Sequence, residues 1–121
     1  MWRYIIKCMF ISLGLWLYLL SFPVFSAESK PVLIGATVSL EGKYKEPSLM
    51  IQDGFKLWEK QVNQRGGLLG RPVKLILYND KSQKDRVESL YKKLITEDKV
   101  DLVLSPYGTP LTLRASQASE R

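Results

Sequence analysis

Two short polar segments carry the residues best suited to bind a small molecule. Residues 39–44 follow the apolar run 31–38, and residues 105–110 follow the apolar run 100–104. In the second segment Thr109 precedes a proline, as is typical of a helix start, because threonine can cap a helix and proline is favoured at its first position. The free backbone N–H groups of such a start, together with the Thr109 hydroxyl, could hold an anion such as a carboxylate. From spacing alone, a Thr109 that only caps its own helix is an equally good interpretation.

Two tyrosines could complete a site between these segments. In open α/β sheets a ligand binds beyond the carboxyl ends of the strands, where the strand order reverses. Both polar segments occupy such positions if the apolar runs before them are strands. Tyr44 and Tyr107 would then supply apolar walls with polar tips. We therefore predict a ligand site that includes Tyr44, Tyr107 and Thr109.

The sequence carries none of the patterns expected of an enzyme or a metal centre. Its 121 residues include no histidine and one cysteine, which excludes imidazole catalysis, His-ligated zinc and an intrachain disulfide. Nucleotide-binding, nucleophile-elbow and metalloprotease motifs are absent from the sequence. Asp80 and Asp85 suggest a pair of carboxylates, but their position around a helix start favours turn and cap residues. We predict no enzymatic activity, no cofactor and no metal.

Alternating apolar runs and amphipathic stripes predict a parallel α/β fold. The runs at 31–38, 73–78 and 100–104 are typical of buried parallel strands. A third helix is expected to open at Thr109. The order strand, helix, strand, helix, strand, helix implies right-handed βαβ units. Two helical stripes separate the strands, the first made of Ile51, Phe55, Trp58 and Val62 and the second of Val87, Leu90, Tyr91, Leu94 and Ile95.

Single residues refine the boundaries of the first two helices. Pro47 and Ser48 are start signals for the first helix, and the glycine pair 66–67 ends it as a left-handed cap. Gly54 is expected on the inner half of this helix, where a missing side chain would let a neighbouring element approach closely. The second helix is expected to begin within residues 82–85.

The first 27 residues have the composition of a secretory signal. Arg3 and Lys7 precede an apolar run that ends in small residues, which is the order expected of a signal peptide. We predict a signal over residues 1–26, mature protein that begins near Ala27 or Glu28, and export to the periplasm. The alternative is an uncleaved anchor, because the apolar segment is just long enough to span a membrane.

The charge distribution gives no support for nucleic-acid binding. The chain has 18 basic and 12 acidic residues, a net charge of +6. Without Arg3 and Lys7 of the predicted signal, 16 basic and 12 acidic residues remain, a net charge of +4. The basic residues are spread among the acidic ones, whereas nucleic-acid binding needs a concentrated basic face. We therefore expect no nucleic-acid partner.

Several sequence stretches resemble one family. The most specific is Asn-x-x-Gly-Gly-x-x-Gly-x-x-Val at residues 63–73, and residues 34–37, 53–54, 78–80 and 103–109 add further landmarks. From about residue 31 onward the chain resembles the periplasmic binding proteins for branched-chain amino acids. The resemblance implies the type I periplasmic binding fold, in which two α/β lobes close over a small solute and deliver it to an ATP-driven permease of the inner membrane.

The resemblance also assigns roles within the predicted site. In this family, hydroxyls and backbone N–H groups in the loop after the third strand hold the carboxylate of the ligand. That role would fall on Thr109, with Gly108 in place of a usual hydroxyl residue, and Tyr44 would supply an aromatic ring that packs on the ligand. Residues 28–121 would form the βαβαβα portion of the N-terminal lobe, and we expect the chain to be a truncated copy.

These observations lead to two hypotheses about function. The leading one is an extracytoplasmic solute-binding component of an ABC transporter for amino acids or similar small polar solutes. The alternative is a ligand-sensing extracytoplasmic domain of a membrane receptor, which uses the same fold.

Overall fold

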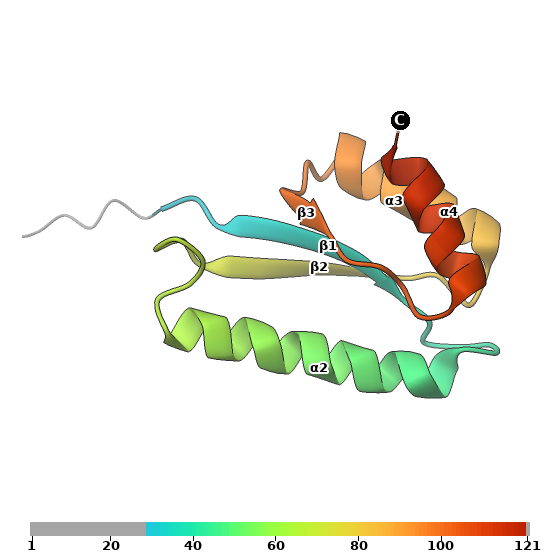
Figure 1. Cartoon of the computed structure of the whole chain (residues 1–121), viewed down its shortest axis with the longest axis horizontal. Coiled ribbons are helices and arrows are strands. Elements are labelled where there is room, and N and C mark those ends of the chain that lie inside the picture. Colours follow the sequence, from blue (N-terminus) through green and yellow to red (C-terminus); the bar gives the residue numbers. More distant parts are fainter. Residues whose placement is uncertain (1–28, 121) are drawn as a thin grey trace, which may run out of the picture.

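The protein alternates strands and helices in the predicted order. The computed structural model describes residues 29–120, and the predicted signal at 1–26 with its cleavage point lies outside them. Figure 1 shows the six elements, which are β1 (Val32–Val38), α2 (Lys45–Gln64), β2 (Val73–Asn79), α3 (Lys84–Thr96), β3 (Leu102–Val103) and α4 (Thr109–Ser119). The βαβαβα architecture expected from the sequence is therefore confirmed.

The three strands form a parallel sheet in the order β2-β1-β3. The helix α2 covers one face of this sheet, and α3 and α4 cover the other (Figure 1). Because the chain first adds β2 on one side of β1 and then β3 on the other, the strand order reverses between β1 and β3. All three carboxyl ends point to the same edge of the sheet, so the loops that follow the strands meet there.

The core is divided between the two faces of the sheet. On the side of α3 and α4, the buried cluster consists of Val87, Tyr91, Leu111, Ala115 and Ala118, with Tyr44 and Val103 packed against it. On the side of α2, the buried residues are Val32, Ile34 and Val73, with Val62, Leu68, Leu75 and Leu104 packed against them. Alternate residues of β1 thus face opposite layers, as a pleated strand requires.

The first helix begins earlier than the sequence predicted. It starts at Lys45, so Pro47 lies in the first turn, where a missing N–H group costs nothing. Ser48 is a buried residue inside the helix and not its cap. The expectation for Gly54 is wrong, because Gly54 is exposed and a Cβ atom there would have no heavy atom within 4 Å. Trp58 of the predicted stripe is 37% exposed.

The end of α2 follows the predicted glycine cap. The amide of Gly66 donates to the Asn63 carbonyl at 3.1 Å, and that of Gly67 donates to the Val62 carbonyl at 2.9 Å. This pair of hydrogen bonds is the Schellman motif. A Cβ atom on Gly67 would lie 1.9 Å from the carbonyl oxygen of Arg71, so only glycine fits at this position.

The remaining elements agree with the sequence apart from their boundaries. The helix α3 starts at Lys84, within the predicted range, and buries Val87, Tyr91 and Leu94. Ile95, the last residue of its predicted stripe, is 38% exposed. The strand β3 is shorter than the predicted run 100–104, because its ladder with β1 pairs only two residues.

Candidate functional site

Three loops meet at the carboxyl edge of the sheet, where the sequence predicted a ligand site. They are residues 39–44 after β1, residues 80–83 after β2 and residues 104–108 after β3 (Figure 1). The third loop leads directly into α4. The predicted positions of both polar segments are therefore confirmed, and the β2–α3 turn adds a third component.

An open hollow of about 540 Å³ lies at the start of α4. Three of the four predicted site residues line it, namely Tyr107, Gly108 and Thr109. Its other walls come from the next turns of the helix, through Thr112, Leu113 and Ser116. None of these six side chains carries a charge, so any anion held here depends on hydroxyl and backbone donors.

The fourth predicted residue, Tyr44, borders the same loop without lining the hollow. Its ring meets that of Tyr107 edge-on, with 6.0 Å between centroids and 62° between planes. Gly108 lies between these rings and the start of α4, and a Cβ atom on it would be 3.5 Å from Cε1 of Tyr44. The structure therefore brings all four predicted residues together.

The cap of α4 is not the residue that the sequence suggested. Gly108 occupies the N-cap position with a φ of 91°, and no side chain makes a capping hydrogen bond. Thr109 is the first residue of the helix. Its side chain is exposed and makes no hydrogen bond within residues 29–120. The capping interpretation of Thr109 is therefore wrong, and its hydroxyl is available to a ligand.

The helix start also leaves backbone donors available. The amides of Leu111 and Thr112 both donate to the carbonyl of Gly108 at 3.0 Å, and Pro110 has no N–H group. Within the described part of the chain, the amides of Gly108 and Thr109 donate no hydrogen bond. Two uncommitted amides and one uncommitted hydroxyl at the positive end of the helix dipole form a small anion-binding arrangement.

One basic residue near the site was missed in the sequence. The ammonium group of Lys43 lies 5.3 Å from the centroid of the Tyr44 ring, a cation–π distance. It therefore places a positive charge on the loop that carries Tyr44. The only sequence signal for it is its position directly before Tyr44.

Buried polar side chains support the loops from below. Asp80 is fully buried, and its Oδ1 atom accepts hydrogen bonds from the Ser39 hydroxyl at 2.6 Å and from the Ser82 amide at 2.8 Å. The amide of Ser39 in turn donates to the hydroxyl of Ser48 at 2.9 Å. Asp80 is a turn residue, as predicted. Its burial and its link to β1 depend on contacts that the sequence does not show.

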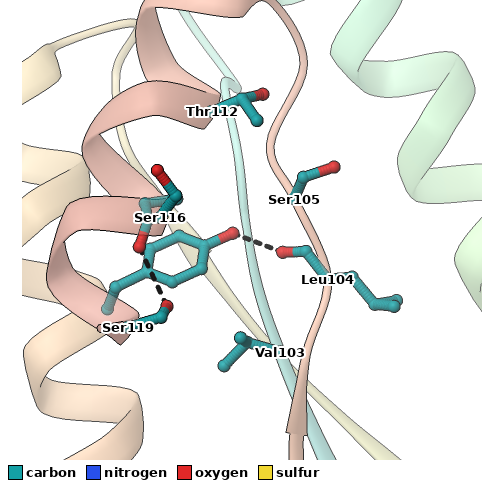
Figure 2. Close-up of a pocket in the computed structure, with 8 residues that line it drawn as sticks. Val103, Leu104, Ser105, Thr112, Ser116 and Ser119 are labelled. Atoms are coloured by element: carbon teal, nitrogen blue, oxygen red, sulfur yellow. Dashed lines mark hydrogen bonds between the residues drawn. The ribbon is translucent and has the colours of Figure 1, made fainter. Parts of the chain in front are cut away.

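A second, smaller hollow between β3 and α4 has a volume of about 160 Å³ (Figure 2). The Tyr91 hydroxyl donates to the Leu104 carbonyl there, and burial, reinforced by the charge of Asp80, raises the pKa of this phenol. The hydroxyls of Thr112, Ser116 and Ser119 donate to backbone carbonyls of the same region. Because these protons are already used, this hollow is less suited to a polar ligand than the one at Thr109.

Comparison with protein families identifies the fold. The periplasmic binding protein family matches residues 31–121. The chain belongs to this family. It is a family of binding proteins and not of enzymes, and membership implies an extracytoplasmic location. Within residues 29–120 no helix is both long and apolar enough to cross a membrane.

Solved structures with the same fold include several transporter components. The isoleucine complex of the substrate-binding protein LivJ from Streptococcus pneumoniae is 24% identical over 75% of this chain and 26% of its own, with a TM-score of 0.72. A possible leucine/isoleucine/valine-binding protein from Rhodopirellula baltica is 21% identical over 83% and 26%, with a TM-score of 0.70. A solute-binding protein from R. palustris in complex with benzoate is 21% identical over 74% and 24%, with a TM-score of 0.65. The chain thus spans about a quarter of the length of these proteins.

Proposed function

We propose that this chain contributes to binding a small carboxylate-bearing solute, such as an amino acid, for an ABC transporter. The observation that carries the proposal is the hollow at the start of α4, where the Thr109 hydroxyl and the amides of Gly108 and Thr109 have no partner within residues 29–120. Such donors at a helix N-terminus suit a carboxylate. The ligands of two proteins with the same fold, isoleucine and benzoate, both carry this group.

Each site residue would have a distinct role. The Thr109 hydroxyl and the two amides would donate to the carboxylate oxygens. Because Gly108 has no side chain, the carboxylate could approach the backbone closely. The rings of Tyr44 and Tyr107 would form the wall on one side, and Lys43 would add a positive charge nearby. The remaining contacts would come from a second lobe, and the solute-loaded protein would then dock onto an inner-membrane permease.

Export would place this site outside the cytoplasm. The proposed signal over residues 1–26 would direct the protein to the periplasm and would be removed near Ala27 or Glu28. Mass spectrometry of a periplasmic extract tests this step, because it should identify that N-terminus. Recovery of intact Met1 protein from membranes would instead support the anchored alternative.

Titration of the full chain with isoleucine, followed by NMR, tests the binding site. The amides of Gly108 and Thr109 should shift as isoleucine is added. Thr109→Ala should weaken binding by about 10- to 100-fold, because it removes one charge-assisted hydrogen bond worth about 1.5–3 kcal/mol. Its melting temperature should not change, because the hydroxyl makes no capping bond.

Thr96→Ala provides the matched control. The Thr96 hydroxyl donates to the Lys92 carbonyl at the end of α3, outside the carboxyl-edge loops and outside both hollows. This variant should bind isoleucine as the parent does. Equal affinities of the two threonine variants, or the absence of any shift at the start of α4, would contradict the proposed site.

A further inference from the structure

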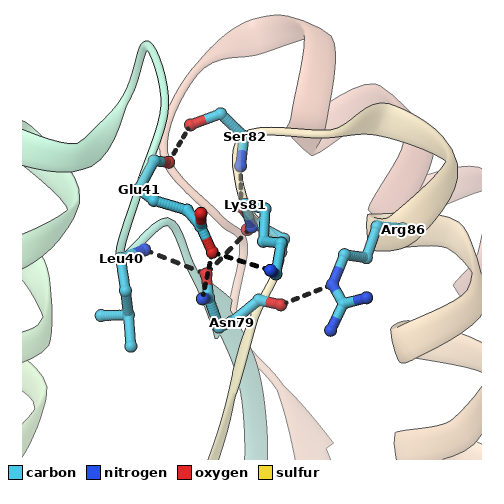
Figure 3. Close-up of polar contacts among 7 residues, drawn as sticks. Leu40, Glu41, Asn79, Lys81, Ser82 and Arg86 are labelled. Atoms are coloured by element: carbon cyan, nitrogen blue, oxygen red, sulfur yellow. Dashed lines mark hydrogen bonds and ion pairs between the residues drawn. The ribbon is translucent and has the colours of Figure 1, made fainter.

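The loop that carries Tyr44 is held in place by the turn between β2 and α3. The side-chain carbonyl of Asn79 accepts a hydrogen bond from the amide of Leu40 at 3.0 Å, and its NH₂ group donates to the Glu41 carboxylate at 3.3 Å. Lys81 pairs with the same carboxylate at 3.0 Å (Figure 3). These contacts are solvent-exposed, and exposed ion pairs contribute little. The stronger constraint therefore has to come from elsewhere in the turn.

Ser82 supplies that constraint because its hydroxyl makes two bonds to the loop at once. It accepts a hydrogen bond from the Tyr44 amide at 3.1 Å and donates one to the Glu41 carbonyl at 2.8 Å. Figure 3 shows the second of these bonds. Gly42 lies directly against this hydroxyl, since a Cβ atom on it would be 2.8 Å from Ser82 Oγ. A single side chain thus fixes both ends of the segment from Glu41 to Tyr44.

The backbone around Ser82 has an unfavourable conformation that needs support. Lys81 and Ser82 have φ values of 56° and 60°, in the left-handed region that residues with a Cβ atom rarely adopt. The buried carboxylate of Asp80 accepts the Ser82 amide and also the Ser39 hydroxyl. The amide of Asp80 donates to the Val38 carbonyl at 3.1 Å. Asp80 therefore holds the turn in this conformation and ties it to the end of β1.

Tyr44 transmits this constraint to the candidate site. Its ring packs against the buried cluster of α3 and α4 and meets the Tyr107 ring. A Cβ atom on Gly108 would lie 3.5, 3.6 and 3.7 Å from three atoms of the Tyr44 ring. Nearly equal distances to three adjacent ring atoms place Gly108 over the face of the ring.

We propose that Ser82, held in its left-handed conformation by Asp80, is a positioning residue that fixes Tyr44 against Gly108 at the mouth of the solute site. The role of Tyr44 as a wall of that site rests on the proposed function. The positioning of the ring is a property of the free protein, so it can be measured without ligand. The two ideas can therefore fail separately.

The first measurement is the chemical shift of the Gly108 α-protons in the full chain. One of these protons lies over the Tyr44 ring and should show an upfield ring-current shift. Ser82→Ala and Ser82→Gly should both reduce it, because both remove the hydroxyl. Ser82→Asn should preserve it in part, since asparagine tolerates the left-handed conformation and keeps a side-chain acceptor. Ser89→Ala, which removes an exposed hydroxyl bonded to the Arg86 carbonyl on α3, should leave it unchanged.

The variants separate the role of the hydroxyl from that of the backbone. An unchanged Gly108 shift in Ser82→Gly, or the same loss in Ser89→Ala, would overturn the proposal. If Ser82→Ala fails to fold, Ser82→Gly still decides the question, because glycine accepts the left-handed conformation without strain.

The second measurement is isoleucine titration of the same variants. Ser82→Gly should bind isoleucine about two- to tenfold more weakly, the fold-change expected for one neutral hydrogen bond, and Ser82→Asn should recover part of the loss. If the parent chain itself shows no isoleucine binding, the proposed function fails while the Gly108 shift still decides the positioning role. A lost Gly108 shift with unchanged isoleucine affinity would overturn the role of Ser82 at the solute site.

Discussion

Replacement of Gly35 by alanine tests how tightly α3 packs on the central strand. Gly35 is a buried residue of β1, and a Cβ atom on it would lie 2.8, 3.1 and 3.2 Å from three side-chain carbons of Leu94. Carbon atoms in contact normally lie about 3.5–4.0 Å apart. Leu94 has an exposed fraction of 0%, so its side chain has no free space into which to move. We therefore expect Gly35→Ala to destabilise the fold.

The expected loss combines two opposing effects. Overpacking of a buried site costs about 1–3 kcal/mol. Alanine also reduces the conformational freedom of the unfolded chain, which returns about 0.4–1 kcal/mol. The net loss in the free energy of unfolding should thus be about 1–2 kcal/mol. For a domain of this size, each kcal/mol lowers the melting temperature by about 4–8 °C.

The same substitution at Gly54 gives a matched control of opposite sign. Gly54 lies inside α2, is exposed, and has space for a Cβ atom. Gly54→Ala should raise the free energy of unfolding by about 0.5–1 kcal/mol, because alanine is the better helix former. The contrast between the two variants isolates the contact with Leu94 from the general effect of losing a glycine.

Urea denaturation followed by circular dichroism measures all three proteins. Adding Leu94→Val to Gly35→Ala should cost less than the two single changes together, by about 0.5–3 kcal/mol, as expected for residues in contact. The argument is refuted if Gly35→Ala is as stable as the parent. It is also refuted if the effects of Gly35→Ala and Leu94→Val are strictly additive.

Two further predictions concern polar contacts. The side chain of Asn63 pairs with the backbone of Val73, accepting from its amide at 2.7 Å and donating to its carbonyl at 2.9 Å, so Asn63→Ala should cost about 1–3 kcal/mol in urea denaturation while the exposed neighbour Gln64→Ala should cost little. A hydrogen bond from Lys81, followed by the charge of Lys81, lowers the pKa of the Glu41 carboxyl below its ordinary value of 4.5; its contribution to stability is therefore present above that ordinary value and is lost as the pH falls through the lowered pKa. An NMR titration should find this lowered pKa and a return toward the ordinary value in Lys81→Gln, and an unshifted Glu41 would contradict the pairing.

The elements of the fold could be predicted because their signals are local. Apolar runs mark the strands, and in α3 the buried residues Val87, Tyr91 and Leu94 follow the helical period. The glycine pair at the end of α2 was predicted for the right reason, since Gly66 and Gly67 both have positive φ angles. Strand boundaries were less certain, because the length of β3 depends on how far its ladder with β1 extends.

Residues whose environment comes from distant segments were predicted less well. Ser48 has the residue type of a helix start, but it lies inside α2 because its hydroxyl accepts the amide of Ser39. Gly54 suggested a close helix contact, and its actual exposure depends on how α2 is rotated against the sheet. Residue type alone cannot report that rotation.

The candidate site shows the same division. The sequence by itself determined which residue types follow the strands, and because parallel strands end at one edge of a sheet, it also determined that Tyr44, Tyr107, Gly108 and Thr109 would meet. Only the tertiary structure decided that Gly108 and not Thr109 occupies the cap, since this depends on the positive φ that Gly108 adopts where the loop turns beneath Tyr44. It also decided that Asp80 and Ser82 hold the Tyr44 loop, because their hydrogen bonds join residues about 40 positions apart.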